Sequence, residues 1–305
     1  MVQVMAQMAA LIGVGVAWRW LRPGGLDADR ARAAVATLVY YLLLPALILS
    51  VLWRAPLGLE SGQVALSAAG GVAAMLALTW LLLRPFRVSR RVRGTLLLAA
   101  AWPNATYLGL PVLEATFGDW ARRIAIQYDL FACFPLLMTA GVLIARHHGD
   151  HGGPENPLAT LLKVPPLWAA ALAVALNLGG VPLPAPLADL LGDVGDAVPA
   201  LMLLALGMGL TWGAWSWGLV PAAALVVGLQ LAVQPALVAA LAGAAGLAGQ
   251  PLQAVVLEAA MPTMILGVVL CDRYGLDTAL YAKAVTLSTA LSLVTLPLWF
   301  GLLGP

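Results

Sequence analysis

The sequence predicts an all-α polytopic membrane protein with ten transmembrane helices. Apolar residues make up 62% of the 305 residues, charged residues only 10%, and the mean hydropathy is +0.93. An ordinary soluble protein is about 25% charged, so this chain has too few charged side chains to cover a water-exposed surface. Two further observations support the fold class: a series of apolar runs, each near the roughly 20 residues that one helical span requires, and an internal repeat.

The apolar runs are continuous and rich in Ala and Leu, whereas lipid-facing β-strands would alternate polar and apolar residues. Ten helices are therefore expected at residues 1–18, 33–53, 62–83, 92–117, 121–145, 158–179, 186–211, 217–246, 251–275 and 278–303. The first run begins at the initial Met without a preceding basic segment, so we interpret it as a retained helix and not as a cleaved signal peptide.

The basic residues predict the orientation in the membrane. Thirteen of the sixteen Lys and Arg residues lie in loops that follow odd-numbered helices, and only Arg54, Arg122 and Arg123 follow even-numbered ones. Positively charged loops stay in the cytoplasm, so both termini are expected outside the cytoplasm, in a multi-pass protein of the cell (inner) membrane. No basic stripe interleaved with aromatics is present, so nucleic acid is not an expected partner.

The eleven tryptophans mostly lie near expected helix ends, which is typical of an interfacial aromatic belt. A substrate cage is the alternative interpretation of these side chains. The two cysteines, Cys133 and Cys271, both lie inside apolar runs. They are predicted to be buried free thiols.

Two short patterns occur twice in the chain, in the same order. Residues 44–49 and 198–203 share Pro-Ala-Leu, and residues 100–104 and 259–263 both read Ala-Ala-x-Pro followed by a polar residue. We interpret the patterns as a repeat of five helices. Because five is odd, the second repeat crosses the membrane in the opposite sense, as in the inverted repeats of secondary transporters.

The repeat divides the chain into a first five-helix unit at 1–146, a cytoplasmic linker at 147–157 and a second unit at 158–305. The linker contains three histidines, so metal binding is one interpretation of it. A solvated connector is favoured, because its Gly and Pro residues give such a site no fixed geometry.

The fourth and ninth helices are each expected to break at a proline. Pro103 and Pro262 cannot donate a backbone hydrogen bond, and their rings clash with the preceding turn. Freed backbone groups cannot face lipid, so the two breaks are expected to cross and to line an enclosed cavity, where a half-helix N-terminus attracts an anion. Two unrelated kinks are the alternative, and Pro45, Pro199 and Pro235 are interpreted as kinks.

The residues around the two breaks are the candidates for substrate binding. They are Pro103, Asn104, Thr106, Tyr107, Gly109, Pro111, Pro262 and Thr263. Asn, Thr and Gly favour helix caps and irregular backbone, which is what a broken helix needs.

Two carboxylates, Asp129 and Glu258, lie deep in apolar runs, where a charge is costly and usually marks an ion path. Burial favours the neutral form of a carboxyl group, so both residues are candidates for coupling transport to a proton or to sodium. A protonated structural carboxyl group is the alternative. Gln230 and Gln234 lie one turn apart on one helix face, and they are candidates to line the cavity or to bond neighbouring helices. No other cofactor and no metal site are expected.

These segments resemble the auxin efflux carrier family. The residues that carry the resemblance are Pro103-Asn104, Gly109-Leu110-Pro111 and Phe117-Gly118 in the fourth helix, Ala259-Ala260-Met261-Pro262 and Cys271-Asp272-Arg273-Tyr274 in the ninth, and Thr295-Leu296-Pro297 in the last. The similarity extends over essentially the whole chain. The fourth and ninth helices are its specific parts.

The resemblance implies a fold similar to that of the sodium–bile acid symporters. Helices 1, 2, 6 and 7 would form a scaffold, and helices 3–5 and 8–10 a mobile transport core with two crossed broken helices. Members of the family are usually dimers that work by an elevator motion. The plant branch, the PIN-FORMED carriers, exports auxin, and bacterial members are commonly named malonate or malate permeases. The family's substrate-contacting Asn is carried over to Asn104.

The sequence also departs from the plant branch, whose long central cytoplasmic loop it lacks. Asp129 and Glu258 stand where the plant carriers have Gln, which implies ion coupling. The expected function is therefore cation-coupled transport of a small organic anion, by a homodimer in the lipid bilayer. No Lys or Arg lies deep in the expected core helices, so the anion would rely on helix dipoles, on Asn104 and on a co-bound cation.

Three other functions are weighed against this one. An auxin-like uniporter would move the same anion without ion coupling. An intramembrane aspartyl protease would use Asp129, but its partner motif Gly-x-Gly-Asp is missing, and the nearest match is residues 193–196. A channel would also need spanning helices, but not crossed repeats. The chain is therefore not expected to be an enzyme.

Overall fold

The computed structural model describes residues 2–150, 162–210 and 220–304, and these residues form helices with no strand among them. Seven helical segments are long and apolar enough to cross a membrane: Val2–Leu21, Ala28–Leu52, Leu59–Leu82, Asp119–His148, Ala185–Gly209, Val220–Ala244 and Thr278–Leu302. Pro165–Leu178 is a shorter apolar helix. The described residues are therefore all-helical and contain enough spans for a multi-pass membrane protein, as predicted.

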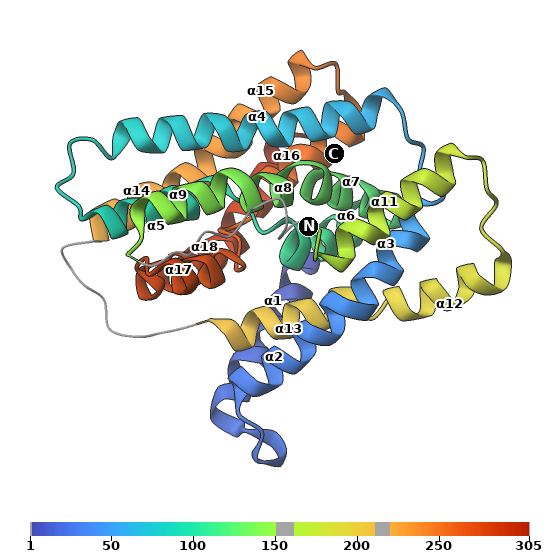
Figure 1. The fold of residues 1–305 in the computed structure, drawn as a ribbon, viewed down its shortest axis with the longest axis horizontal. Coiled ribbons are helices and arrows are strands. Elements are labelled where there is room, and N and C mark those ends of the chain that lie inside the picture. Colours follow the sequence, from blue (N-terminus) through green and yellow to red (C-terminus); the bar gives the residue numbers. More distant parts are fainter. Residues whose placement is uncertain (1, 151–161, 211–219, 305) are drawn as a thin grey trace.

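The α-helices follow the predicted segments, several of which are interrupted (Figure 1). They are α1 Val2–Leu21, α2 Ala28–Leu38, α3 Leu44–Leu52, α4 Leu59–Leu82, α5 Arg90–Ala101, α6 Leu110–Phe117, α7 Arg122–Tyr128, α8 Phe134–Leu136, α9 Val142–His148, α11 Pro165–Leu178, α12 Ala185–Gly195, α13 Val198–Gly209, α14 Val220–Gly228, α15 Gln234–Ala244, α16 Gly249–Ala259, α17 Gly267–Tyr274 and α18 Thr278–Leu302. The sixth predicted helix begins seven residues late, at a Pro-Pro pair that suits a first helical turn. Part of its predicted start, and most of the predicted linker, lie outside the described residues.

Four prolines of the described residues lie two positions after the end of a π-helical turn. The turns are η2 Val39–Leu43, η3 Ala105–Gly109, η5 Asp129–Cys133 and η8 Leu229–Val233, and each ends two residues before Pro45, Pro111, Pro135 or Pro235. A further π turn, η6 Leu137–Gly141, has no proline after it. Because proline cannot donate to the carbonyl four residues back, the residue before it reaches back five residues, and the helix continues through a bulge. Such bulges occur frequently at functional sites.

One group of helices, α1–α3 and α11–α13, occupies the lower and right-hand part of Figure 1. Within it α1 packs on α13 through Gly15 and Gly207, where an added Cβ would overlap backbone atoms of the opposite helix. Close approach through small residues is typical of packing between membrane helices. Asn177 of α11 donates to the carbonyls of Leu52, Trp53 and Ala55 at distances of 3.1, 2.9 and 2.8 Å, and so caps the end of α3.

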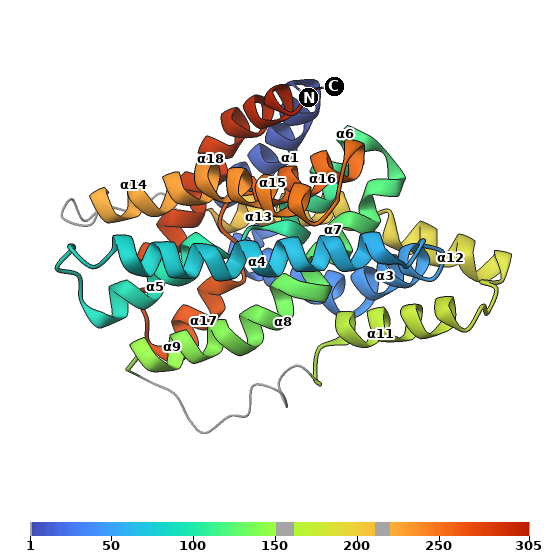
Figure 2. The same ribbon diagram turned by 90° about the horizontal axis from the view of Figure 1, so that it is seen from above.

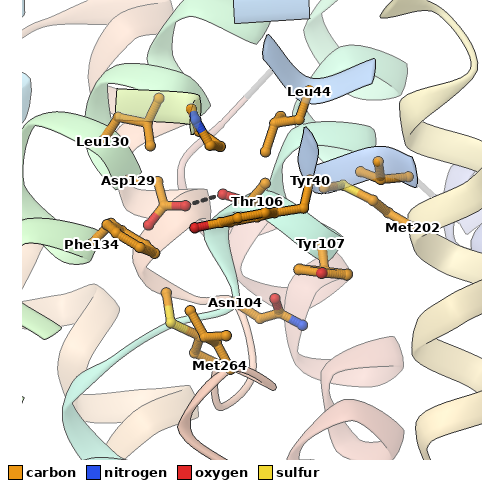
Figure 3. Close-up of a pocket in the computed structure, with 13 residues that line it drawn as sticks. Tyr40, Leu44, Asn104, Thr106, Tyr107, Asp129, Leu130, Phe134, Met202 and Met264 are labelled. Atoms are coloured by element: carbon orange, nitrogen blue, oxygen red, sulfur yellow. Dashed lines mark hydrogen bonds between the residues drawn. The ribbon is translucent and has the colours of Figure 1, made fainter. Parts of the chain in front are cut away.

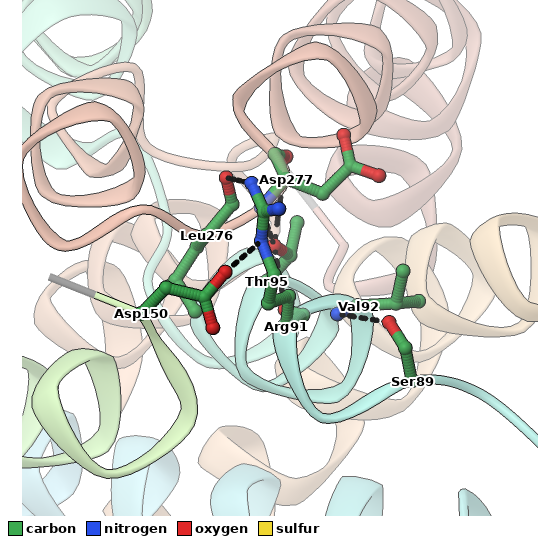
Figure 4. Close-up of polar contacts among 7 residues, drawn as sticks. All are labelled: Ser89, Arg91, Val92, Thr95, Asp150, Leu276 and Asp277. Carbon is green, nitrogen blue, oxygen red and sulfur yellow. Dashed lines mark hydrogen bonds and ion pairs between the residues drawn. The ribbon is translucent and has the colours of Figure 1, made fainter.

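The second group contains α4–α9 and α14–α18, and α4 runs along it over α5 and α15 (Figure 2). Its corner at the start of α5 is fastened by polar contacts (Figure 4). Thr95 accepts a hydrogen bond of 3.0 Å from the backbone N–H of Asp277, and Arg91 donates to the carbonyl of Leu276 and pairs with Asp150 at 3.3 Å. The ends of α5, α9 and α18 are therefore joined at one corner.

Candidate functional site

The two predicted helix breaks meet each other. Helix α5 ends at Ala101 and α16 at Ala259, and the extended segments that follow lie antiparallel. The backbone N–H of Asn104 donates to the carbonyl of Pro262 at 2.7 Å, and that of Met264 donates to the carbonyl of Trp102 at 2.9 Å. Pro103 and Thr263 lie opposite each other in this crossing. The broken form of both helices, predicted from their prolines, is confirmed.

Backbone carbonyls that the breaks set free are bonded by side chains from neighbouring segments. The carbonyl of Ala99, four residues before Pro103, accepts the hydroxyl of Thr263 at 2.9 Å. Gln234 donates to the carbonyl of Ala101 at 3.2 Å, and Gln230 to that of Met261 at 2.9 Å. These contacts place the two glutamines in the second of their predicted roles, hydrogen bonding between helices, and neither of them lines the central cavity.

The central cavity lies beside the crossing, where three π-helical turns meet (Figure 3). Its volume is about 60 Å³, several times the roughly 10–15 Å³ that one water molecule needs. The π turns supply six of the lining residues: Val39 and Tyr40, Thr106 and Tyr107, and Asp129 and Leu130. Leu44, Asn104, Phe134, Pro166, Met202, Met264 and Leu266 complete the wall.

Three polar side-chain atoms of this cavity are buried without a hydrogen-bond partner among the described residues. Asn104 is only 1% exposed, and neither its amide nitrogen nor its amide oxygen has a hydrogen-bond partner among the described residues. Asp129 accepts a hydrogen bond from Thr106 on one carboxylate oxygen, and its other oxygen has no partner in the described part of the protein. An unpaired buried polar group costs about 1–3 kcal/mol, so these atoms are placed to bind a polar ligand or water.

Glu258 lies next to the cavity but outside its lining. The side chain is fully buried, and neither carboxylate oxygen has a hydrogen-bond partner in the described part of the chain. It touches the fourth-helix break at Gly109, where an added Cβ would overlap the carboxylate. Asp129 is close enough to interact with Glu258 electrostatically. The two predicted coupling carboxylates are thus neighbours, and Gly109 makes the space for one of them.

The predicted site residues therefore divide into three groups. Asn104, Thr106, Tyr107 and Asp129 line the central cavity, and Pro103, Pro262 and Thr263 form the crossing. Gly109, at the end of the π turn beside Glu258, and Pro111, in the first turn of α6, are not among the lining residues. The side chain of Asn104 caps no helix, so capping, the other role that its position suggested, is absent.

The sequence analysis missed Tyr40, Phe134 and Leu266, which line both this cavity and a second one of about 230 Å³. Pro45 and Pro135 were the available signals, because each follows a π turn that contributes to the wall. The second cavity extends to basic residues at one end of the protein, Lys163 and Arg273.

The opposite end of the same helices is held by ion pairs. Arg122, at the start of α7, pairs with Glu114 at 2.5 Å and with Asp196 at 2.8 Å, and Arg123 pairs with Glu60 at 2.5 Å. Asp196 comes from the end of α12, so Arg122 links the two groups of helices at this end.

No cluster of three or more His, Cys, Asp or Glu side chains suited to a metal occurs in the described ranges. His147 and His148, two of the three histidines of the predicted linker, lie edge to face at the end of α9 with ring centroids 4.7 Å apart. Both cysteines are buried and free, as predicted.

The chain is similar to known transporters over most of its length. The family described as membrane transport protein matches residues 4–300. An uncharacterized transporter of the archaeon Methanothermobacter thermautotrophicus is 31% identical over 279 residues, which are 90% of each chain. An uncharacterized transporter of Methanocaldococcus jannaschii is 26% identical over 70% of each chain, and one of Escherichia coli K12 is 25% identical over 66% of this chain and 65% of its own.

Proposed function

The chain belongs to the membrane transport protein family, the auxin efflux carrier family that its sequence resembles, and on that premise we propose that it is a secondary transporter of a small organic anion. The anion is a carboxylate, either auxin-like or similar to malate and malonate. The protein moves it by alternating access, with the helices of the second group carrying the site past those of the first.

The observation that carries this proposal is the unpartnered amide of Asn104. Its nitrogen can donate two hydrogen bonds to a carboxylate, and the hydroxyls of Tyr40 and Tyr107 belong to residues of the same cavity. The half-helix that begins after Asn104 adds the positive end of its dipole, which favours an anion. No Lys or Arg lines the central cavity, so these neutral donors supply the recognition.

We further propose that the chain crosses the membrane ten times, as two inverted repeats. The pairing of the α5–α6 break with the α16–α17 break supports this arrangement. Helices α1–α3 and α11–α13 correspond to the scaffold, and α4–α9 and α14–α18 to the transport core. Both termini then face away from the cytoplasm, the protein lies in the cell membrane, and it forms a homodimer.

Transport is proposed to be coupled to a cation at Asp129 and Glu258. Two permanent negative charges beside the cavity would repel an anionic substrate, because Coulomb interactions strengthen in a dry interior. A proton or a sodium ion that binds there with the substrate removes this repulsion. Oxygen ligands suit sodium as a hard cation, and the free oxygens of Glu258 and Asp129 are available for either ion.

Uptake of labelled mono- and dicarboxylates into proteoliposomes tests the function, with proton and sodium gradients varied separately. Saturable uptake that follows one gradient is expected, and Glu258→Gln should flatten that dependence. Asn104→Ala should lower uptake at least about tenfold, since hydrogen bonds to a charged group contribute roughly 1.5–3 kcal/mol each. Uptake that ignores both gradients would make the protein a uniporter, and the absence of any carboxylate uptake would refute the proposed function.

A further inference from the structure

A third and larger cavity lies beside the segment that follows the ninth-helix break. Its volume is about 510 Å³, within the range of roughly 300–1,000 Å³ that is typical of ligand sites. Its wall is built from α1, α2, the end of α13, α17 and the first turns of α18. Ile265 contributes to this wall, while Met264 and Leu266 on either side of it line the central cavity. The short segment of residues 264–266, which follows the crossing, therefore contributes to the walls of both cavities.

The charge of this wall is strongly positive. Three basic side chains, Arg19, Arg32 and Lys283, line it, and Asp29 is its one acidic residue. Asp29 is already neutralised, because Arg19 pairs with it at 2.8 Å while also donating to the carbonyl of Met208 at 2.7 Å. Basic residues therefore outnumber acidic ones in this wall, whereas the described lining of the central cavity contains the acidic residue Asp129 and no Lys or Arg.

Arg32 is the residue best placed to bind an anion here. Its Nε is buried and has no hydrogen-bond partner among the described residues, which is costly for a charged group. Its side chain runs past Gly209, where an added Cβ would lie 3.3 Å from the Arg32 Cδ and 2.9 Å from the Ile265 Cδ1. The glycine leaves room for the arginine. Arg32 also interacts electrostatically with Tyr107 in the wall of the central cavity.

We propose that this cavity is a second anion-binding site, in which Arg32 binds a carboxylate of the substrate on its way to or from Asn104. The inference rests on the proposed function, because it assumes an organic anion as the substrate. Arginine suits this role, since its planar guanidinium binds a carboxylate through two parallel hydrogen bonds. The described lining of the central cavity contains no Lys or Arg. In this proposal the positive charge of Arg32 attracts the anion, and the neutral donors of the central cavity then select it.

The test is the binding stoichiometry of purified protein in detergent, measured by equilibrium dialysis with labelled acetate, malonate, succinate and malate. Wild-type protein is expected to bind two molecules of its preferred carboxylate per chain. Arg32→Gln and Asn104→Ala should each leave one, and the double variant none. Binding that remains in Arg32→Gln should depend less on salt, because salt screens exposed charges.

Two variants of the same helix serve as controls. Arg30→Gln removes an equal charge from an exposed position outside the cavity, and it should leave both sites intact. Arg32→Lys keeps the charge and should retain the second site with at most about tenfold weaker affinity, the loss of bidentate geometry. If Arg32→Gln binds as Arg30→Gln does, the second site is refuted while the proposed function stands. If no carboxylate binds the wild-type protein, both the second anion-binding site and the proposed function are refuted.

Discussion

The two helix breaks look alike in sequence but differ in how their polar side chains are used. At the ninth-helix break, the hydroxyl of Thr263 donates to Ala99, its backbone N–H donates to the hydroxyl of Ser288 at 3.1 Å, and Tyr281 donates to Met264 at 2.8 Å. At the fourth-helix break, both amide atoms of Asn104 are buried and have no partner within the described ranges. The Thr263 side chain is thus hydrogen-bonded within the protein, whereas the Asn104 side chain is not hydrogen-bonded to any described residue.

The difference implies that equivalent positions of the proposed repeat have different roles. A buried polar group with a partner stabilises the fold, whereas one without a partner costs free energy until a ligand binds. Under the proposed function, the Thr263 break holds the crossing together and the Asn104 break binds the substrate. The predictions below separate stability from transport, and they run from the largest expected effect to the smallest.

Gly109→Ala should have the largest effect, because it alters the contact between the π turn that follows the fourth-helix break and the Glu258 side chain. The new Cβ would overlap the buried carboxylate of Glu258, and overpacking of this kind typically costs about 1–3 kcal/mol. We expect a lower melting temperature together with nearly complete loss of uptake. Gly228→Ala is the matched control, since nothing lies within 4 Å of its added Cβ. Equal behaviour of the two variants would show that the contact is unimportant.

Thr263→Val should lower stability without weakening substrate binding. It leaves the carbonyl of Ala99 without its donor, at a cost of about 1–3 kcal/mol, while the cavity keeps its lining. Thr289→Val is the control, because the Thr289 hydroxyl is buried and has no partner to lose. Thermal unfolding in detergent and the KM of uptake give the two readouts. A large rise in KM for Thr263→Val would indicate that the substrate binds at the ninth-helix break, which would contradict the proposed site at Asn104.

Gln230→Leu and Gln234→Leu should both lower stability by about 1 kcal/mol, the usual net contribution of one hydrogen bond. Gln230 donates at 2.9 Å and Gln234 at 3.2 Å, so the first variant should lose more. Neither should change KM beyond about twofold, because both side chains support the crossing from outside the central cavity. A loss of substrate affinity without a loss of stability would show that Gln230 and Gln234 belong to the binding site.

Asp196→Asn should have the smallest effect on stability. It removes one partner of Arg122, whose pairing with Glu114 at 2.5 Å remains, and such ion pairs contribute at most about 1 kcal/mol. If the contact closes this end of the transport path, exchange rates should rise while the melting temperature stays nearly constant. An unchanged rate would leave the ion pair with a purely local role.

The fold was predictable because its signals are local. Apolar run length, the sparse charge and the two prolines at Pro103 and Pro262 were enough to predict an all-helical membrane protein and both breaks. The sequence did not predict that Thr263 has hydrogen-bond partners while Asn104 has none among the described residues. The partners of Thr263 are Ala99 and Ser288, which are distant in the sequence. Local pattern does not reveal which polar groups are satisfied by distant segments.

The π turns were a local signal that went unused. Pro45 and Pro235 were interpreted as kinks, but a proline inside a continuing helix leaves a wider turn before it. Three of these turns meet at the central cavity. Arg32 was missed for a different reason: it lies at the predicted start of the second helix, and only packing brings it beside the ninth-helix break.

The central claim is that the substrate is held by the break at Asn104 and not by the break at Thr263. The most direct test compares counterflow uptake by Asn104→Ala and Thr263→Val in matched proteoliposomes, with the amount of folded protein measured in each. The account predicts that Thr263→Val retains wild-type KM per folded molecule, and that Asn104→Ala loses at least about tenfold in uptake although it is folded. Wild-type uptake by Asn104→Ala, or an equal loss in both variants, would contradict it.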